Sequence, residues 1–155
     1  MIGTSCRITT EYFGPVTKPV SNSDVGAFVC HRIWGKVDAI KDYCSMGVFR
    51  DRVLIAGTLY HNYYPDAGVI ELTSASVSRH WLTRPVIKAM FGLPFDAFKC
   101  QLVVLRVSQK NPPMLKIART FGFSEYVIPR LRGRDEDEHV FTLTDDAWRE
   151  HRVLH

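Results

Sequence analysis

The stretch NPPMLKIARTFGF, residues 111–123, contains the signals for one short helix with both of its ends specified. Asn111 can cap the helix, and the two prolines after it suit a first turn in which amides need no partners. Gly122 can adopt the left-handed conformation that commonly ends a helix. The residues expected to pack inward recur at helical spacing: Met114, Leu115, Ala118 and Phe121. We therefore predict a helix between Asn111 and Gly122.

A second helix is expected in TRPVIKAMFGLPFDAFKC, residues 83–100. Thr83 can cap this helix and Pro85 can occupy its first turn, whereas Gly92 and Pro94 should kink or split it. Its apolar side chains recur every three or four residues, which is the spacing of an amphipathic helix. This stripe consists of Val86, Ile87, Met90, Phe91, Phe95 and Phe98.

The segments around these helices predict strands. QLVVLRVS, residues 101–108, is nearly continuous in apolar residues, which is typical of a strand buried on both faces. A strand, a helix and then a buried strand indicate a right-handed crossover. Upstream we expect a strand within residues 5–13, a helix capped by SNSD (21–24) and ended by Gly35, two strands within 44–64 with a turn at 50–52, and a strand within 68–78. Downstream we expect two strands, EYVIPRLRG (125–133) and EHVFTLTDDAW (138–148). The order predicts an α+β, mixed α/β fold with helices on both faces of a sheet.

Composition and length indicate one globular domain over residues 1–155, with 46% hydrophobic and 12% aromatic residues. The chain shows neither a signal-peptide pattern nor an apolar run long enough to cross a membrane, which predicts a cytoplasmic protein. The four cysteines form no Cys-x-x-Cys pair, so we expect buried free thiols and no metal site. Trp34 and Trp148 are expected in the core.

Charge is concentrated in one part of the chain, although the net charge is only +4. Residues 79–119 contain eight basic residues and a single acid, Asp96. A local positive field attracts anions, so the segment favours a phosphate-bearing partner, either a cofactor or a nucleic acid. The alternative is that these side chains are solvated faces of helices.

Taken in order, these features resemble the GNAT superfamily of acyl-CoA N-acetyltransferases over residues 45–148. Asn111, Gly122 and Phe123 match the family's spacing of an asparagine, a helix and Gly-Phe. IPRLRGRDEDEHVFTLTDDAW (128–148) resembles the ending of the branch that includes ribosomal-protein alanine acetyltransferases. SRHWLTRPVIKAMFGLPFDAFKCQLVVLRVSQKN (78–111) resembles a phage and proteobacterial subgroup.

The resemblance implies a central sheet of six to seven strands in which a splayed strand pair forms the acyl-CoA cleft. It also implies a loop after the fourth strand whose amides hold the pyrophosphate of acetyl-CoA at a helix start. The matching window HWLTRP (80–85) departs from the family pattern at His80, Thr83 and Pro85. Phosphate binding should therefore depend more on the guanidinium groups of the segment. The cofactor-binding residues implied are Ser76, Val77, Ser78, Arg79, His80, Trp81, Leu82, Thr83, Arg84 and Asn111.

For catalysis, the resemblance implies that Glu71 is the general base, and the alternative is a cross-strand polar residue. Many relatives use a tyrosine seven residues after the asparagine to protonate the departing thiolate, but Ala118 stands at that position. Ser108 and Tyr126 are the substitutes that we consider for this acid. Three tyrosines, at 60, 63 and 64, either contact the acceptor or simply pack. Trp81 either covers the adenine or the loop, or anchors the helix.

The function implied is acetyl transfer from acetyl-CoA to a primary amine of a small molecule or protein, by direct attack in a ternary complex. One alternative is a noncatalytic GNAT-fold binding or assembly module with a degenerate CoA site. Another is direct nucleic-acid binding through the basic segment, although no nucleic-acid-binding motif is present. Sheet-edge homodimers are common among relatives. The sequence selects no particular acceptor amine.

Overall fold

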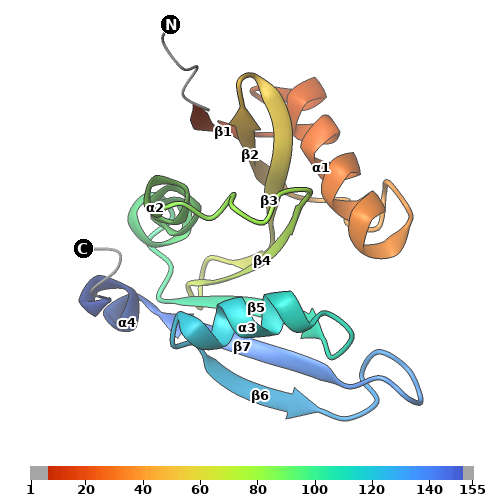
Figure 1. Ribbon diagram of the computed structural model, residues 1–155. Coiled ribbons are helices and arrows are strands. Elements are labelled where there is room, and N and C mark those ends of the chain that lie inside the picture. Colours follow the sequence, from red (N-terminus) through yellow and green to blue (C-terminus); the bar gives the residue numbers. More distant parts are fainter. Residues whose placement is uncertain (1–6, 152–155) are drawn as a thin grey trace, which may run out of the picture. The chain divides into compact units, whose positions relative to one another are not determined.

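The computed structural model describes residues 7–151, which form the expected mixture of strands and helices (Figure 1). Within these residues the strands form one seven-stranded sheet in the order β1-β2-β3-β4-β5-β7-β6, which confirms the α+β fold class. Along the chain the elements are β1 (Ile8–Phe13), α1 (Pro19–Trp34), β2 (Cys44–Arg50), β3 (Val53–Tyr64), β4 (Val69–Ser76), α2 (Arg84–Gly92), the π-helical turn η1 (Leu93–Ala97), β5 (Leu102–Ser108), α3 (Pro112–Thr120), β6 (Ser124–Ile128), β7 (Glu138–Thr144) and α4 (Asp145–Glu150).

The contacts divide the chain into two compact units. The first unit runs up to Asn62 and includes Thr73–Leu93, and the second consists of Tyr63–Leu72 and the chain from Pro94 onward. Both β3 and β4 therefore contribute residues to each unit. Whether the chain is a single domain stays a prediction.

In the first unit, α1 packs on the strands through buried apolar side chains. Val25 and Val29 join Phe13, Cys30 and Leu59 in a buried cluster. Gly57 on β3 allows this close packing, because a Cβ atom there would lie 2.6 Å from a methyl carbon of Val25.

The ends of α1 match the sequence prediction only in part. The helix ends, as predicted, at Gly35, which has a φ of 70°. The prediction that residues 21–24 cap its start is wrong, because the helix already begins at Pro19. Asn22 lies inside the helix, where its buried amide accepts a hydrogen bond from Ser45 Oγ and donates one to the carbonyl of Tyr43.

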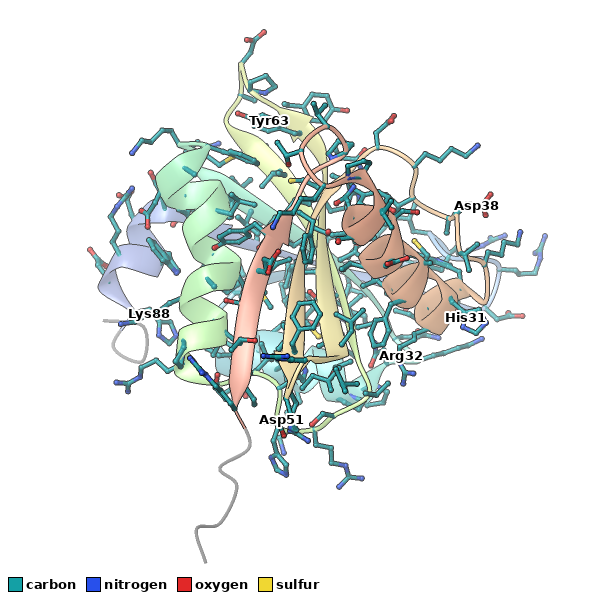
Figure 2. The ribbon with its side chains drawn as sticks, turned by 90° about the horizontal axis from the view of Figure 1, so that it is seen from above. His31, Arg32, Asp38, Asp51, Tyr63 and Lys88 are labelled. Carbon is teal, nitrogen blue, oxygen red and sulfur yellow. The ribbon has the colours of Figure 1, made fainter. Side chains whose placement is uncertain are left out.

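The hairpin between β2 and β3 turns at the predicted place. Asp51 and Arg52 both have positive φ angles, of 50° and 74°. Two-residue turns with positive φ match the twist of antiparallel strands, so this turn fixes the pairing of the two strands. Asp51 lies at the tip of the hairpin (Figure 2).

Helix α2 begins and ends where the sequence predicts. The Thr83 hydroxyl accepts a hydrogen bond from Val86 N at 3.5 Å, and the helix gives way to η1 after Gly92. Two tyrosine hydroxyls donate to carbonyls of its last turn, Tyr12 to Ala89 and Tyr60 to Met90. These bonds satisfy acceptors at a point where the regular helical ladder changes.

In the second unit, β4 pairs in parallel with β5, and β5 and β6 pair antiparallel with β7. Helix α3 is capped by Asn111, whose Oδ1 accepts from Met114 N at 3.4 Å, and it ends before Gly122 with a φ of 77°, as predicted. Its inward side chains divide into buried Leu115 and Ala118 and half-buried Met114 and Phe121.

Two strand predictions for the second unit need correction. β5 is buried on one face only, because burial alternates along it and Arg106 is exposed. The DDAW sequence does not extend β7. Thr144 ends that strand and caps α4 by accepting from Ala147 N at 3.1 Å, and Asp145 and Asp146 favour a helix start through the helix dipole.

The two tryptophans predicted in the core, Trp34 and Trp148, differ in burial. Trp148 is buried as expected, but the prediction for Trp34 is wrong, because it is 40% exposed at the last residue of α1. Cys30, Cys44 and Cys100 are free thiols, and Cys6 lies outside the described residues. Between residues 7 and 151, no helix is both long and apolar enough to span a membrane.

Candidate functional site

The loop after β4 carries most of the residues predicted to bind a cofactor, and it is tightly tied to itself and to the hairpin. Ser76 Oγ lies 2.8 Å from the Ser78 carbonyl and accepts from Ser78 N at 2.9 Å. Val77 N donates to the Ile55 carbonyl on β3 at 2.9 Å. His80 N donates to Ser78 Oγ at 3.3 Å. The amides of Val77, Ser78 and His80 are therefore already engaged within the first unit.

The start of α2 uses further amides of this segment. Thr83 accepts from Val86 N through its side chain and from Ile87 N through its carbonyl. By contrast, in the part of the chain that the structure describes, no hydrogen bond is made by the amides of Arg79, Trp81, Leu82 and Arg84. These four donors lie in the loop and at the helix start, where a phosphate group can be held.

The side chains of the loop divide into exposed cations and a buried anchor. Arg79, His80 and Arg84 are exposed, whereas Trp81 is only 5% exposed. The burial of Trp81 favours the interpretation that it anchors the helix. The exposed guanidinium groups are free to form the bidentate contacts that arginine makes with phosphate.

Arg50 is a residue of this site that sequence reasoning missed. It lies at the end of β2, and its Nη2 donates to Ser78 Oγ at 3.2 Å. Its Nε is buried without a hydrogen-bond partner among residues 7–151. The strand pairing brings it to the loop across 28 residues of sequence, so no local motif could have revealed it. The only signal was the charged turn RDR at residues 50–52.

A shallow depression of about 430 Å³ lies next to the same hairpin. Arg7, Thr9, Asp51 and Arg52 line it, and none of the residues predicted from sequence does. Asp51 binds the backbone of Arg7 here, with its Oδ1 accepting from Arg7 N at 3.2 Å. The depression therefore coincides with the packing of the β1 start on the hairpin turn.

In the second unit, the predicted base Glu71 lies on β4 beside Val104 of β5. Aligned residues of neighbouring strands point to the same face, and side chains two residues apart on one strand share a face. Arg106 is therefore the diagonal neighbour of Glu71. The pKa of Arg106 is raised, first by its hydrogen bond to Glu138 and then by the negative charges of Glu138 and Glu71.

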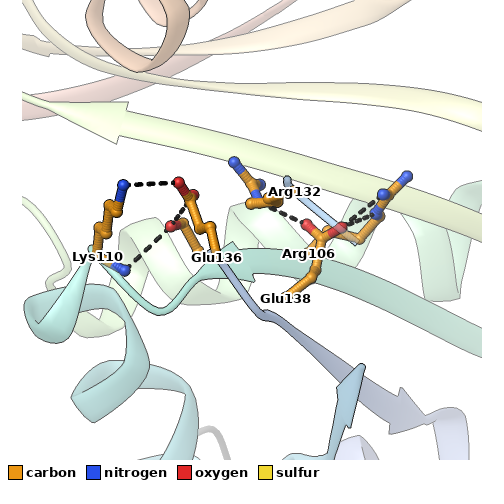
Figure 3. A network of polar contacts seen from close by, with 6 residues as sticks. Arg106, Lys110, Arg132, Glu136 and Glu138 are labelled. Carbon is orange, nitrogen blue, oxygen red and sulfur yellow. Dashed lines mark hydrogen bonds and ion pairs between the residues drawn. The ribbon is translucent and has the colours of Figure 1, made fainter. Parts of the chain in front are cut away.

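Glu138 on β7 is the centre of a polar network (Figure 3). Its carboxylate is almost fully buried, with 1% of the side chain exposed. Oε2 accepts from Arg106 Nε at 3.1 Å and from Arg106 Nη2 at 2.5 Å, while Oε1 accepts from Arg132 Nε at 2.8 Å. Burying a carboxylate is costly unless it is paired, so both arginines are needed to hold it in place.

The two candidate acids differ in their surroundings. Ser108 Oγ donates to Glu136 Oε2 at 2.5 Å and accepts from Lys110 N at 3.0 Å, so its hydroxyl is engaged. The pKa of Glu136 is lowered by that serine and by Lys110. Tyr126 lies on β6 and is 58% exposed.

The register places Glu71, Ser108 and Tyr126 on the same face of the second unit's strands. They do not form a cluster. Ser108 lies four residues beyond Val104, about 13 Å along β5, and Tyr126 lies three strands from β4, about 14 Å across the sheet. Asn111 is exposed next to Ser108, whose carbonyl accepts from Asn111 N at 3.0 Å. Ala118 is fully buried in α3.

No family model matches the chain, and no curated protein matches it in sequence. Solved structures do match. Mutant forms of the spermidine/spermine N-acetyltransferase from Vibrio cholerae superpose with a TM-score of 0.70 and 12% identity over 94% of this chain and 99% of theirs. A structure described as a probable GNAT-family acetyltransferase from Chromobacterium violaceum superposes with a TM-score of 0.59 and 20% identity over 72% of this chain. The chain has the fold of the GNAT acetyltransferases.

The extent of these matches differs. The chain spans 63% of the length of the chromobacterial protein and 65% of another matched acetyltransferase, but 99% of the Vibrio enzyme. Residues 76–84 run from the end of the fourth strand, β4, to the start of α2. The unpaired amides and exposed arginines of this segment suit an anionic group.

Proposed function

We propose that this protein is an N-acetyltransferase that transfers an acetyl group from acetyl-CoA to a primary amine of a small molecule or protein. The observation that carries the proposal is the loop after β4 in a GNAT fold. Its four unpaired amides, of Arg79, Trp81, Leu82 and Arg84, are donors of the kind that bind a diphosphate. Two of these residues add exposed guanidinium groups, which compensate for the amide that Pro85 lacks.

In this proposal the loop binds and orients the cofactor. The internal bonds of Ser76 and Ser78 order the loop before binding, so less conformational freedom is lost. Arg50 contributes positive charge from β2 and holds Ser78 in place. Bound acetyl-CoA supplies the acetyl group as an activated thioester. The other residues of this loop that the sequence predicts to bind acetyl-CoA, such as Val77, remain part of the proposed cofactor site, and so does Asn111.

The proton of the attacking amine goes to Glu71, directly or through water, as the new C–N bond forms and the C–S bond breaks. Glu71 lies on the same strand, β4, that leads into the cofactor loop. Ser108 and Tyr126 stay the two candidates for protonating the departing thiolate; the serine hydroxyl already donates to Glu136, and Tyr126 lies three strands from β4.

A noncatalytic binding module is the second candidate function. Four amides of the loop already donate to groups of the protein, those of Val77, Ser78, His80 and Thr83. The position of the usual acid is a fully buried alanine, Ala118. Such a protein would bind CoA weakly or not at all and would release no thiol from acetyl-CoA. The two candidates thus differ in one measurable reaction.

Three finer predictions accompany the proposal. The free thiols Cys30, Cys44 and Cys100 support a reducing compartment such as the cytoplasm. The narrower likeness to the phage, proteobacterial and ribosomal-protein alanine acetyltransferase branch, and a homodimer through a sheet edge, stay predictions.

Calorimetric titration with acetyl-CoA tests the proposed cofactor site. We expect saturable binding by the wild type and clearly weaker binding by Arg84→Ala. Lys88→Ala is the matched control, because Lys88 lies four residues later on α2 and points away from β1 (Figure 2). Binding that is absent in the wild type, or equally reduced in both variants, would contradict the assignment of the loop.

A further inference from the structure

The second unit holds an arginine that is fixed in position next to the predicted base. α3 covers the opposite face of these strands, to which the pair Arg119–Glu125 connects it. On the face away from α3, Arg106 and Glu71 are diagonal neighbours on β5 and β4. The two charges interact, since Glu71 is one of the groups that raise the pKa of Arg106.

The anchoring of Arg106 leaves part of its guanidinium available. Nε and Nη2 both donate to Glu138, whereas Nη1 makes no hydrogen bond to any residue between 7 and 151. The side chain is 43% exposed, although its carboxylate partner is almost fully buried. A guanidinium held in this way presents its free edge in a defined direction, so little order is lost when it binds a ligand.

The charge of the network is not balanced. Glu138 carries one negative charge, and both Arg106 and Arg132 pair with it. The three side chains therefore leave one net positive charge, and Arg106 is the more exposed of the two arginines. Next to it, Glu71 presents one negative charge. A carboxylate beside a fixed guanidinium is complementary to a ligand that carries an ammonium group and an anionic group.

We propose that the acceptor is a small primary amine that carries an anionic group a few bonds from its nitrogen, as in an amino acid or an aminoalkyl phosphate. Its amine lies at Glu71, and its carboxylate or phosphate binds the free edge of Arg106. Glu71 takes the amine proton while the nitrogen forms the bond to the acetyl carbon, and the thiolate leaves with the electron pair of the C–S bond. A polyamine is disfavoured because a second ammonium group would face Arg106. This inference rests on the proposed acetyltransferase function.

Matched acceptor pairs test this inference on the full chain with acetyl-CoA, by following thiol release. Each pair differs only in the anionic group: glycine with glycinamide, and phosphoethanolamine with ethanolamine. For the wild type we expect kcat/KM to be at least roughly tenfold higher for the anionic member of at least one pair, since hydrogen bonds to charged groups are stronger than those between neutral groups. The pair that shows the preference identifies the anion as carboxylate or phosphate.

Two variants test whether Arg106 causes the preference for anionic acceptors. Arg106→Gln should raise KM for the anionic acceptor and leave KM for its neutral partner unchanged, and Arg106→Lys should restore part of the preference. Arg119→Gln is the matched control, because Arg119 makes a similar two-bond pair with Glu125 on the α3 face. If Arg106→Gln does not fold, the preference of the wild type and the kinetics of Arg106→Lys still test the role of Arg106.

The inference is overturned if kcat/KM for neutral amines or spermidine equals that for the anionic acceptors. It is also overturned if Arg106→Lys and Arg106→Gln change KM equally for both members of a pair. The proposed function would then still stand. If the protein neither binds acetyl-CoA nor transfers to any amine of the panel, the proposed function fails and takes the inference with it.

Discussion

The loop after β4 and the charged face of β5 and β7 are built on different principles. In the loop, the groups available to a ligand are backbone amides and the exposed guanidinium groups of Arg79 and Arg84, and neighbouring residues of one segment provide nearly all of them. On the face, the groups are side chains from β4, β5, β7 and the segment before β7, held by a buried carboxylate. The first arrangement suits a constant, anionic cofactor. The second can be changed residue by residue, which suits selection of an acceptor.

The largest effect should come from removing the centre of the charged face. Glu138→Ala leaves Arg106 and Arg132 close together without their shared partner, and breaking a buried pair typically costs about 3 kcal/mol. Urea denaturation measures the loss of unfolding free energy. Glu136→Ala is the control, because Glu136 is more exposed and pairs with a surface lysine. Equal small losses for the two variants would show that the face does not depend on Glu138.

The next largest effect should be on catalysis, where a change at Glu71 should lower the rate without weakening cofactor binding. Glu71→Gln keeps the size of the side chain but cannot accept a proton, so kcat should fall by about a hundredfold, the lower end of general base effects. The dissociation constant of acetyl-CoA should stay the same, because the cofactor loop is untouched. Steady-state kinetics and calorimetry measure the two quantities. Equal damage to both would remove Glu71 as the base.

Arg50 tests whether the loop extends beyond its own segment. Arg50→Met removes the donor to Ser78 and one positive charge, and acetyl-CoA should bind roughly tenfold more weakly, as expected for a hydrogen bond to a charged group. Arg52→Met removes an equal charge from the same hairpin turn without breaking a bond to Ser78. The idea fails if the two variants weaken binding to the same extent.

The smallest effect concerns the opposite face of the second unit. Hydrogen bonds from Arg119 and His139 lower the pKa of Glu125 from 4.5 to about 2. Because the pKa is lowered in the folded state, the stabilisation is present above about pH 4.5 and is lost as the pH falls toward 2. Thermal unfolding of the wild type and Glu125→Gln should therefore differ at pH 5 and converge near pH 2. The difference should be small, since the pair is partly exposed and screened by salt. A gap that does not change with pH would contradict this assignment.

Local signals in the sequence predicted local structure well. Asn111 and Gly122 bound α3, Thr83 caps α2, and the turn of the β2–β3 hairpin lies at Asp51 and Arg52. Local signals failed where a tertiary contact used the same residue for another purpose. Asn22 resembles a cap in sequence, but its amide binds Ser45 and Tyr43.

The candidate site shows the same limit. Residues 76–84 are contiguous, so a family resemblance could point to all of them at once. Arg50 reaches Ser78 in the first unit, and Arg106 reaches Glu138 in the second, only through strand register, which the sequence does not specify. The apolar run of β5 even suggested a strand buried on both faces, which concealed Arg106 as an exposed side chain.

The most direct test of the proposed function is thiol release from acetyl-CoA in the presence of a mixture of small amines, measured for the wild type and Glu71→Gln. An acetyltransferase predicts release that saturates with both acetyl-CoA and amine and that falls strongly in the variant. Saturable binding of acetyl-CoA without amine-dependent release would contradict catalysis and would leave a GNAT fold that serves as a binding module.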